Sequence, residues 1–156
     1  MCRAAFASLV AFITILLQIE SPRAQEVSYQ NLIAPVLAGG ETVIGETIVY
    51  PSGAPARVTA AIVTVPPGGQ TGWHVHPVPL FAYILEGELV VNYNDRGQRT
   101  YRVGEGLLEA MKTRHNGRNN GSVPVRILAV YIGAEGRANA EAAEAPKDLD
   151  AARSLR

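Results

Sequence analysis

The stretch GGQTGWHVHPVPLFAYILEG, residues 68–87, carries two histidines, His74 and His76, that are separated by a single residue. In an extended strand successive side chains alternate between the two faces, so these imidazoles point the same way. Two protonated imidazoles on one face would repel each other, whereas two neutral ones can share a metal ion. The pair alone is a weak sign of a metal site, because a histidine beside an apolar strand is usually a packed or surface residue.

The residues around this stretch alternate short runs of β-branched residues with glycine- and proline-containing turns. We expect strands at residues 42–50, 57–65, 80–85, 88–93, 98–103, 107–110 and 123–132. Residues 94–97, Asn-Asp-Arg-Gly, are a hairpin signal, and residues 116–122, rich in asparagine and glycine, are predicted to form a loop. Many short strands at near-regular spacing predict an all-β sandwich or barrel. Its expected core residues are Val63, Val65, Ile84, Leu89, Val91, Ile127, Leu128 and Val130.

The chain contains three histidines, and the third, His115, follows another short extended segment far along the sequence. A β-barrel is the kind of fold that can bring His115 to the same interior point as the His74–His76 pair. Cys2 is the only cysteine and lies at the very N-terminus, so the rest of the chain has no thiolate to offer a metal.

The spacing of these residues resembles the two sequence motifs of the cupin superfamily. Residues 68–87 are similar to the first motif, with matches at Gly68, His74, His76 and Gly87. Residues 104–119 are similar to the second motif, with matches at Gly104, His115 and Asn119. The resemblance implies a single cupin barrel, a double-stranded β-helix or jelly roll, over residues 25–133 with its core at about residues 42–132. It also implies one divalent metal ion (Fe, Mn, Zn or Ni) on His74, His76 and His115.

Two departures from the motifs bear on this interpretation. Leu80 stands where the first motif has a metal-binding glutamate, and Ala110 and Lys112 replace the proline and glycine of the second motif. The missing proline and glycine loosen the turn expected before His115. Three neutral imidazoles would leave the charge of the ion uncompensated and leave sites open for water, oxygen or an anionic substrate. A vestigial barrel without metal also remains open.

Glu109 is the nearby carboxylate that could compensate for Leu80. We expect it to face the cavity, as a fourth ligand or as a catalytic acid/base group; the alternative is that it faces solvent. Asn119 is either a hydrogen-bonding partner of a ligand histidine or a turn residue. Other candidates for the pocket are Trp73, Tyr83 and Leu80 in its wall and Arg114 at its mouth. The alternative for the two aromatic residues is that they pack in the core, and for Arg114 that it lies in an exposed loop.

The two ends of the chain differ in composition from the barrel. Residues 4–19 are nearly all apolar, which predicts a signal peptide at residues 1–24, cleaved after Ala24, or else an uncleaved anchor. Cleavage would leave no stable membrane span and a periplasmic or secreted protein. Residues 134–156 are rich in alanine and charge, and are predicted to be a peripheral helix or a disordered tail without a functional role. The formal net charge is zero and no long basic run occurs, which argues against nucleic acid as a partner.

Two functions remain open on these grounds. One is an exported metalloenzyme of the dioxygenase or lyase/isomerase type that acts on a small molecule, with Glu109 as its catalytic group. The other is a non-catalytic cupin that binds a small molecule or the metal itself. A carboxylate or arginine beside the metal would favour the enzyme. A wholly apolar lining of the cavity would favour the binding module. The resemblance also implies a homodimer, because cupins commonly pair through strands outside the barrel.

Overall fold

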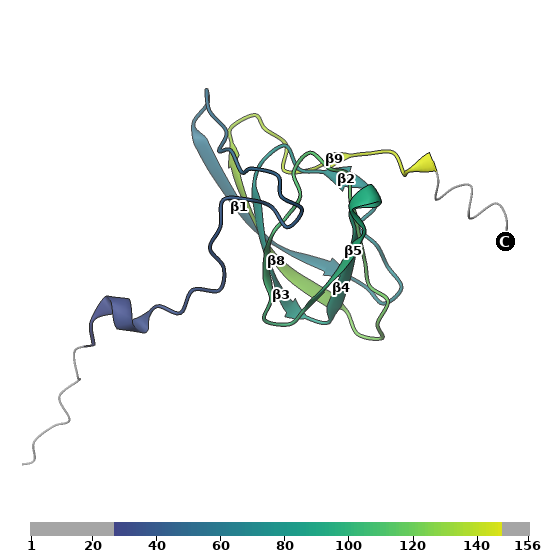
Figure 1. Ribbon diagram of the computed structural model, residues 1–156, viewed down its shortest axis with the longest axis horizontal. Coiled ribbons are helices and arrows are strands. Elements are labelled where there is room, and N and C mark those ends of the chain that lie inside the picture. The colour runs from purple at the N-terminus through teal and green to yellow at the C-terminus, as the bar shows by residue number, and fades with distance from the viewer. Residues whose placement is uncertain (1–26, 148–156) are drawn as a thin grey trace, which may run out of the picture. The chain divides into compact units, whose positions relative to one another are not determined.

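The protein is described by a computed structural model over residues 27–147 (Figure 1). The predicted signal peptide at residues 1–24 and the last part of the tail, residues 148–156, lie outside the described residues. The described residues fall into two units, residues 27–34 and residues 35–147. The described part of the first unit contains the 3₁₀ helix η1 (Tyr29–Leu32), whose side chains are exposed. Over residues 27–147, no helix has both the length and the apolar character needed to span a membrane.

The second unit is built of antiparallel strands in three groups, as the all-β prediction requires (Figure 1). A four-stranded sheet has the order β1-β8-β3-β6 and faces a three-stranded sheet with the order β5-β4-β7, while β2 pairs with β9 at one end. The bounds are β1 (Ala56–Val65), β2 (His74–Val75), β3 (Leu80–Glu86), β4 (Glu88–Asn92), β5 (Gln98–Arg102), β6 (Gly106–Leu108), β7 (Asn116–Arg118), β8 (Val125–Ala134) and β9 (Glu141–Ala142). A second 3₁₀ helix, η2 (Asn94–Arg96), forms the turn of the predicted hairpin between β4 and β5. The all-β barrel predicted from the sequence is confirmed.

The core lies between the two larger sheets and follows the alternation of the strands. On β3, Leu80, Ala82 and Ile84 are buried while Phe81 and Tyr83 are only half-buried on the opposite face. The predicted core residues Val65, Ile84, Leu89, Val91 and Ile127 are buried, and Val63 packs against them. The prediction was wrong for Leu128 and Val130, which are half-buried. On β8 the neighbours Ile127 and Ala129 point inward, so a period of two places Leu128 and Val130 on the outer face.

Three local predictions are corrected by the structure. Residues 42–50 do not form a strand: Glu41 and Thr47 make an isolated bridge around a tight turn in which Gly45 has a φ of +84°. Within the predicted loop 116–122, residues 116–118 form β7 and pair with β4, because backbone pairing needs no β-prone side chain when a strand edge is available. The described part of the tail is neither helical nor irregular throughout, since it supplies β9, which pairs with β2.

Gly87 shows why the turn after β3 needs glycine. Its φ is +75°, in the left-handed region that residues with a side chain rarely adopt. A Cβ at this position would lie only 2.7 Å from the carbonyl oxygen of Pro124. The turn can therefore approach the start of β8 only with glycine.

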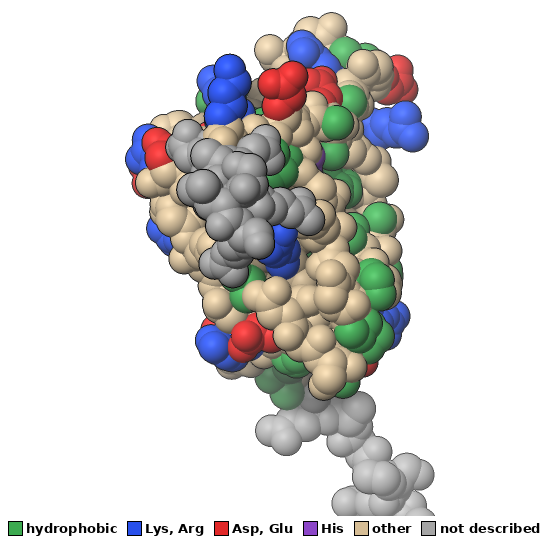
Figure 2. Space-filling model, turned by 90° about the vertical axis from the view of Figure 1, so that its right-hand side faces the viewer, with side chains coloured by type: hydrophobic (Ala, Val, Ile, Leu, Met, Phe, Trp, Pro, Cys, Tyr) green, Lys and Arg blue, Asp and Glu red, His purple; other side chains and the backbone are tan. Residues whose placement is uncertain are grey.

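The surface carries both signs of charge. On the face shown in Figure 2, acidic and basic side chains are interspersed and no large patch of one sign is visible. This agrees with the formal net charge of zero.

Candidate metal centre

Two distant chain segments bring the three histidines together. His74 begins β2, His76 follows that strand directly, and His115 directly precedes β7. The backbones of His74 and His115 exchange two hydrogen bonds, each of 3.0 Å from nitrogen to oxygen. This isolated bridge joins the segments side by side and explains why residues 41 positions apart share one site.

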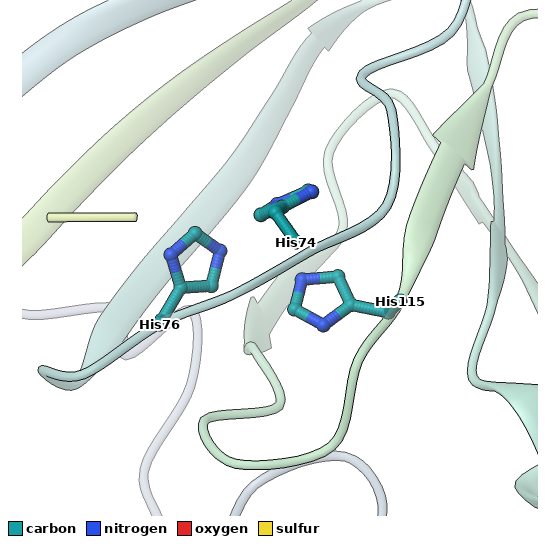
Figure 3. A group of neighbouring side chains, drawn as sticks. All are labelled: His74, His76 and His115. Atoms are coloured by element: carbon teal, nitrogen blue, oxygen red, sulfur yellow. The ribbon is translucent and has the colours of Figure 1, made fainter. Parts of the chain in front are cut away.

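The three rings surround one point inside the barrel (Figure 3). Their centroids are 4.4 Å apart for His74 and His115, 4.8 Å for His74 and His76, and 5.1 Å for His76 and His115. One nitrogen of each ring lies within 4.8 Å of those of the other two. The structure thus brings together all three of the predicted ligands.

Each ring is oriented by a hydrogen bond from its Nδ1 to a backbone carbonyl. A carbonyl oxygen can only accept, so Nδ1 carries a proton, and in the neutral form of such a ring the lone pair is on Nε2. Such a bond fixes both the tautomer and the direction of a metal-binding imidazole. The acceptors are the carbonyls of Gly72 for His74 (2.8 Å), Asn139 for His76 (2.8 Å) and Thr113 for His115 (2.9 Å).

The electrostatic state of the rings also suits a metal ion. Burial lowers the pKa of His76 and of His115 to about 4, so both are neutral at pH 7, the form that a metal ligand requires. The Nε2 of His115 is buried without a hydrogen-bond partner. A buried polar atom left unpaired costs free energy, of order 1–3 kcal/mol, and a bound cation would remove this cost. The residues therefore fit a divalent metal ion held by three imidazoles.

A cavity of about 70 Å³ adjoins the three histidines. Its wall is mostly aliphatic and comes from β1, β3, β4, β6 and β8. Leu80 belongs to this wall and is 6% exposed, so the position of the motif glutamate holds methyl groups that cannot bind an ion. Of the described residues that line the cavity, none is lysine or arginine.

Glu109 lies in the wall of the same cavity and is 6% exposed, so it does not face solvent. Its Oε1 accepts a hydrogen bond of 2.8 Å from the backbone nitrogen of Ala110. Burial raises the pKa of Glu109 to about 7, although a hydrogen bond with Tyr93 acts in the opposite direction. Its carboxylate is not part of the group of ligand atoms around the shared point. Of the two roles considered for Glu109, this placement favours an acid/base group over a fourth ligand.

The other predicted residues lie away from the cavity. Asn119 is buried, and its amide nitrogen donates to the carbonyls of Val65 (2.9 Å) and Val123 (2.8 Å). Its Oδ1 accepts a hydrogen bond from the backbone nitrogen of Gly121 (2.9 Å). Asn119 therefore stabilises the turn before β8, which is the second of its two expected roles, and these three hydrogen bonds are to the backbone rather than to a ligand histidine.

Trp73, Tyr83 and Arg114 are not among the described residues that line the cavity. The carbonyl of Trp73 accepts a hydrogen bond of 2.9 Å from Ala143, and the Arg114 guanidinium donates to the carbonyl of Glu144 at 3.3 Å. Both residues thus contact the C-terminal segment that follows β8.

Tyr131 and Asn139 are among the contributors to the site that were missed from the sequence. Tyr131 lines the cavity, with its ring centroid 5.7 Å from that of His76, and burial raises the pKa of its hydroxyl. The alternation of β8 was the available signal, because Tyr131 shares a face with Ile127 and Ala129. Asn139 acts through its backbone carbonyl, for which the sequence offers no signal.

Comparison with known proteins agrees with the architecture. Residues 61–131 match the family model of the cupin domain. No curated protein matches the sequence.

Among solved structures, the chain is similar to the DMSP lyase DddQ from Ruegeria pomeroyi DSS-3, with 22% identity over 55% of this chain and 42% of that chain, and a TM-score of 0.48. It is also similar to the oxalate decarboxylase of Bacillus subtilis, a protein with Mn(II) centres (22% identity, 64% of this chain, 28% of that chain, TM-score 0.46). A cupin domain from Bordetella pertussis Tohama I matches at 26% identity over 50% of this chain and 83% of that chain, with a TM-score of 0.45. The chain spans less than half the length of the first two proteins. Since all three TM-scores are below 0.5, the chemistry of the site is judged from its own side chains.

Proposed function

We propose that the small cupin domain of this chain is a metal-dependent enzyme that performs acid–base chemistry of the lyase or isomerase type on a small molecule. One observation carries the proposal: the wall of one cavity presents three imidazoles, each with a ring nitrogen within 4.8 Å of those of the other two, together with the buried carboxyl group of Glu109. The imidazoles are a ligand set for a divalent ion, and the carboxyl group is a proton carrier beside it. A wholly apolar wall would have favoured a binding module.

When bound, the ion would polarise an oxygen atom of the substrate as a Lewis acid. His74, His76 and His115 would hold the ion as neutral ligands and leave its positive charge uncompensated, because Leu80 supplies no carboxylate. This favours a substrate with an oxygen donor, and an anionic one above all. Glu109, with a pKa of about 7, can take a proton from the substrate and return it at neutral pH.

The cavity favours a small ligand with an apolar body. Its volume of about 70 Å³ restricts the ligand to a small molecule. Its wall is mostly aliphatic, so the polar part of the ligand would lie at the histidines and its carbon chain against the sheets.

The test is elemental analysis of the protein purified without an affinity tag, beside the double variant His74→Ala/His76→Ala. We expect a near-stoichiometric divalent metal that is lost in the variant. Zinc, manganese or nickel would direct the search to lyase and isomerase substrates, and iron to oxygen consumption, the dioxygenase alternative. Absence of metal even after anaerobic reloading would overturn the proposal and leave a small-molecule binding module.

Export is a further part of the proposal and rests on the apolar run at residues 4–19. We expect a mature N-terminus after Ala24 in a periplasmic or secreted fraction. N-terminal sequencing of the protein from that fraction is the check, and an intact N-terminus on a membrane-bound protein would instead support the uncleaved anchor.

We also propose that the domain forms a homodimer through the outer face of the β1–β8–β3 sheet. Val58 and Ile62 on β1 are 64% and 48% exposed, and β1 is an edge strand of the sheet. An apolar face next to an open strand edge favours pairing with a second copy. Light scattering should show that the wild type is a dimer and that Val58→Asp is a monomer. A monomeric wild type would exclude the proposed homodimer.

A further inference from the structure

Two carboxylates bind every backbone N–H group between Glu109 and Arg114. Glu109 accepts the N–H of Ala110, at 2.8 Å. Glu46 accepts the next three through its two oxygens: Oε2 binds Met111, at 2.5 Å, and Oε1 binds Lys112 and Thr113, at 3.2 and 2.9 Å. The Thr113 hydroxyl also donates to Oε1, at 2.9 Å. Four consecutive amides of one turn are thus held by side-chain oxygens.

This turn is the segment that the sequence departures were expected to loosen. Ala110 and Lys112 occupy the proline and glycine positions of the second cupin motif. Glu46 reaches the turn from 65 to 67 residues earlier in the chain. Hydrogen bonds from these amides outweigh burial and lower the pKa of Glu46, so the carboxylate is charged at neutral pH and its bonds to the amides are charge-assisted.

Glu46 is itself held by a compact turn. Its backbone nitrogen donates to the hydroxyl of Thr42 at 3.0 Å, and its carbonyl accepts the N–H of Thr42 at 2.8 Å. Thr42 is 5% exposed. The carboxylate is therefore presented to the 110–113 turn from a fixed base.

The other side of the same turn holds two of the three histidines. The carbonyl of Met111 accepts the backbone N–H of His76 at 2.9 Å. The carbonyl of Thr113 accepts the Nδ1–H of His115 at 2.9 Å. Met111 and Thr113 thus bind Glu46 through their backbone N–H groups. Their carbonyls bind the backbone of His76 and the ring of His115, respectively.

We propose that Glu46 is a positioning residue of the metal site, which fixes the 110–113 turn and thereby sets His76 and His115 in the geometry that binds the ion. The inference rests on the proposed metal-binding function. Glu46 is not in the group of ligand atoms formed by the three histidines, and it does not line their cavity. It replaces the rigidity that proline and glycine would give to this turn.

The test compares the Zn²⁺ affinity of the metal-free wild type with that of Glu46→Ala, by titration against a competing chelator. Partners that orient metal ligands typically contribute 10- to 100-fold to affinity, and we expect a loss in this range. Glu41→Ala is the matched control, since Glu41 is an exposed glutamate of the same turn region, and its affinity should equal that of the wild type. Co²⁺-loaded samples give a second readout, because their visible spectrum reports the coordination geometry and should change in Glu46→Ala only.

Glu46→Gln keeps the size of the side chain and one acceptor oxygen. If Glu46→Ala does not fold, the Zn²⁺ affinity of Glu46→Gln is compared with that of the wild type instead. Equal Zn²⁺ affinity of wild type and folded Glu46 variant would overturn this inference alone. The inference would also be overturned if the unfolding temperature of a Glu46 variant fell while the Zn²⁺ affinity of its folded form stayed unchanged. Glu46 would then have a purely structural role. Absence of Zn²⁺ binding by the wild type would overturn the proposed function and this inference together.

Discussion

Ala82 on β3 and Ala129 on β8 lie directly opposite each other in the sheet, and both line the cavity beside the three histidines. Their side chains are 5% and 2% exposed. Two methyl groups at the same level of the wall leave room that larger side chains would fill. We therefore expect this pair to limit the length of the ligand.

Replacing Ala129 by valine should shorten the accepted ligand and leave metal content unchanged. The methyl groups that valine adds would occupy part of the cavity of about 70 Å³, which leaves less room for the ligand. The measurement is metal content together with binding of carboxylic acids of increasing chain length to the metal-loaded protein. Ala54→Val, at an exposed position outside the strands, is the control. An unchanged length preference in Ala129→Val would contradict the prediction.

Metal removal should destabilise the wild type and have no effect on His115→Ala. An ion that binds only the folded state adds about 2.7 kcal/mol when its free concentration is 100 times the dissociation constant. Thermal unfolding with added Zn²⁺ and with excess chelator measures the difference. A chelator-sensitive His115→Ala would show that the ion is bound elsewhere.

Glu109→Gln should retain the metal and lose activity. The loss of one acid/base group typically costs 10²- to 10⁴-fold in rate, whereas Gln keeps the size and much of the packing of the side chain. Turnover and metal content are measured on the same sample once a substrate is known. Glu135→Gln, an exposed change, should leave both unaffected. Loss of the metal from Glu109→Gln would instead make Glu109 a ligand.

The raised pKa of Glu109 also predicts a pH dependence of stability. Because folding raises this pKa from 4.5 to about 7, the folded protein holds a proton that the unfolded chain releases in this interval. The ionisation of Glu109 therefore lowers the stability of the metal-free protein as the pH rises from 4.5 to 7. His76 and His115 act in the opposite direction, since burial lowers their pKa from 6.5 to about 4.

Comparison with Glu109→Gln isolates the glutamate from the two histidines. The metal-free wild type should lose stability relative to this variant as the pH rises from 4.5 to 7. Urea unfolding of both proteins across this range is the measurement, and a constant difference between them would mean that the pKa of Glu109 is not raised by folding.

Leu80→Glu should strengthen metal binding and lower the free energy of unfolding of the metal-free protein. The new carboxylate would lie in the cavity wall, where it compensates the charge of a bound ion but is costly to bury without one. Unfolding free energies with and without Zn²⁺ should therefore differ more than in the wild type. Leu80→Met, a volume-conserving control, should change stability by less than about 1.5 kcal/mol in both states. Equal stabilisation by Zn²⁺ in Leu80→Glu and the wild type would argue against the placement of residue 80 beside the ion.

Gly87→Ala should destabilise the protein more than Gly136→Ala. Both glycines have similar positive φ, +75° and +73°, so the backbone strain that alanine brings is expected to be similar. A Cβ on Gly87 would also meet the Pro124 carbonyl oxygen at 2.7 Å, whereas Gly136 has no atom within 4 Å of that position. Urea unfolding measures the difference, and equal losses would contradict the close approach.

Most of the strands could be predicted from the sequence. Those at residues 57–65, 80–85, 88–93, 98–103, 107–110 and 123–132 agree with the structure to within two residues at each end. Their signals are local: β-branched residues in short runs, bounded by turn residues. The segment 42–50 has the same composition, yet it forms a turn in which Thr42 and Glu46 bond to each other. Composition could not distinguish the two outcomes, because that choice depends on what the segment contacts.

The three histidines were predictable because a strand period of two and a motif spacing are both properties of the linear chain. The groups that orient them were not. Backbone carbonyls of Gly72, Thr113 and Asn139 bind their Nδ1 atoms, and every residue has such a carbonyl whatever its side chain. Glu46 and the 110–113 turn meet across more than 60 residues, and the inward direction of Glu109 depends on the packing of the barrel. Periodicity and spacing thus identified the strands and the ligands, whereas long-range packing selected the carboxylates and carbonyls that complete the site.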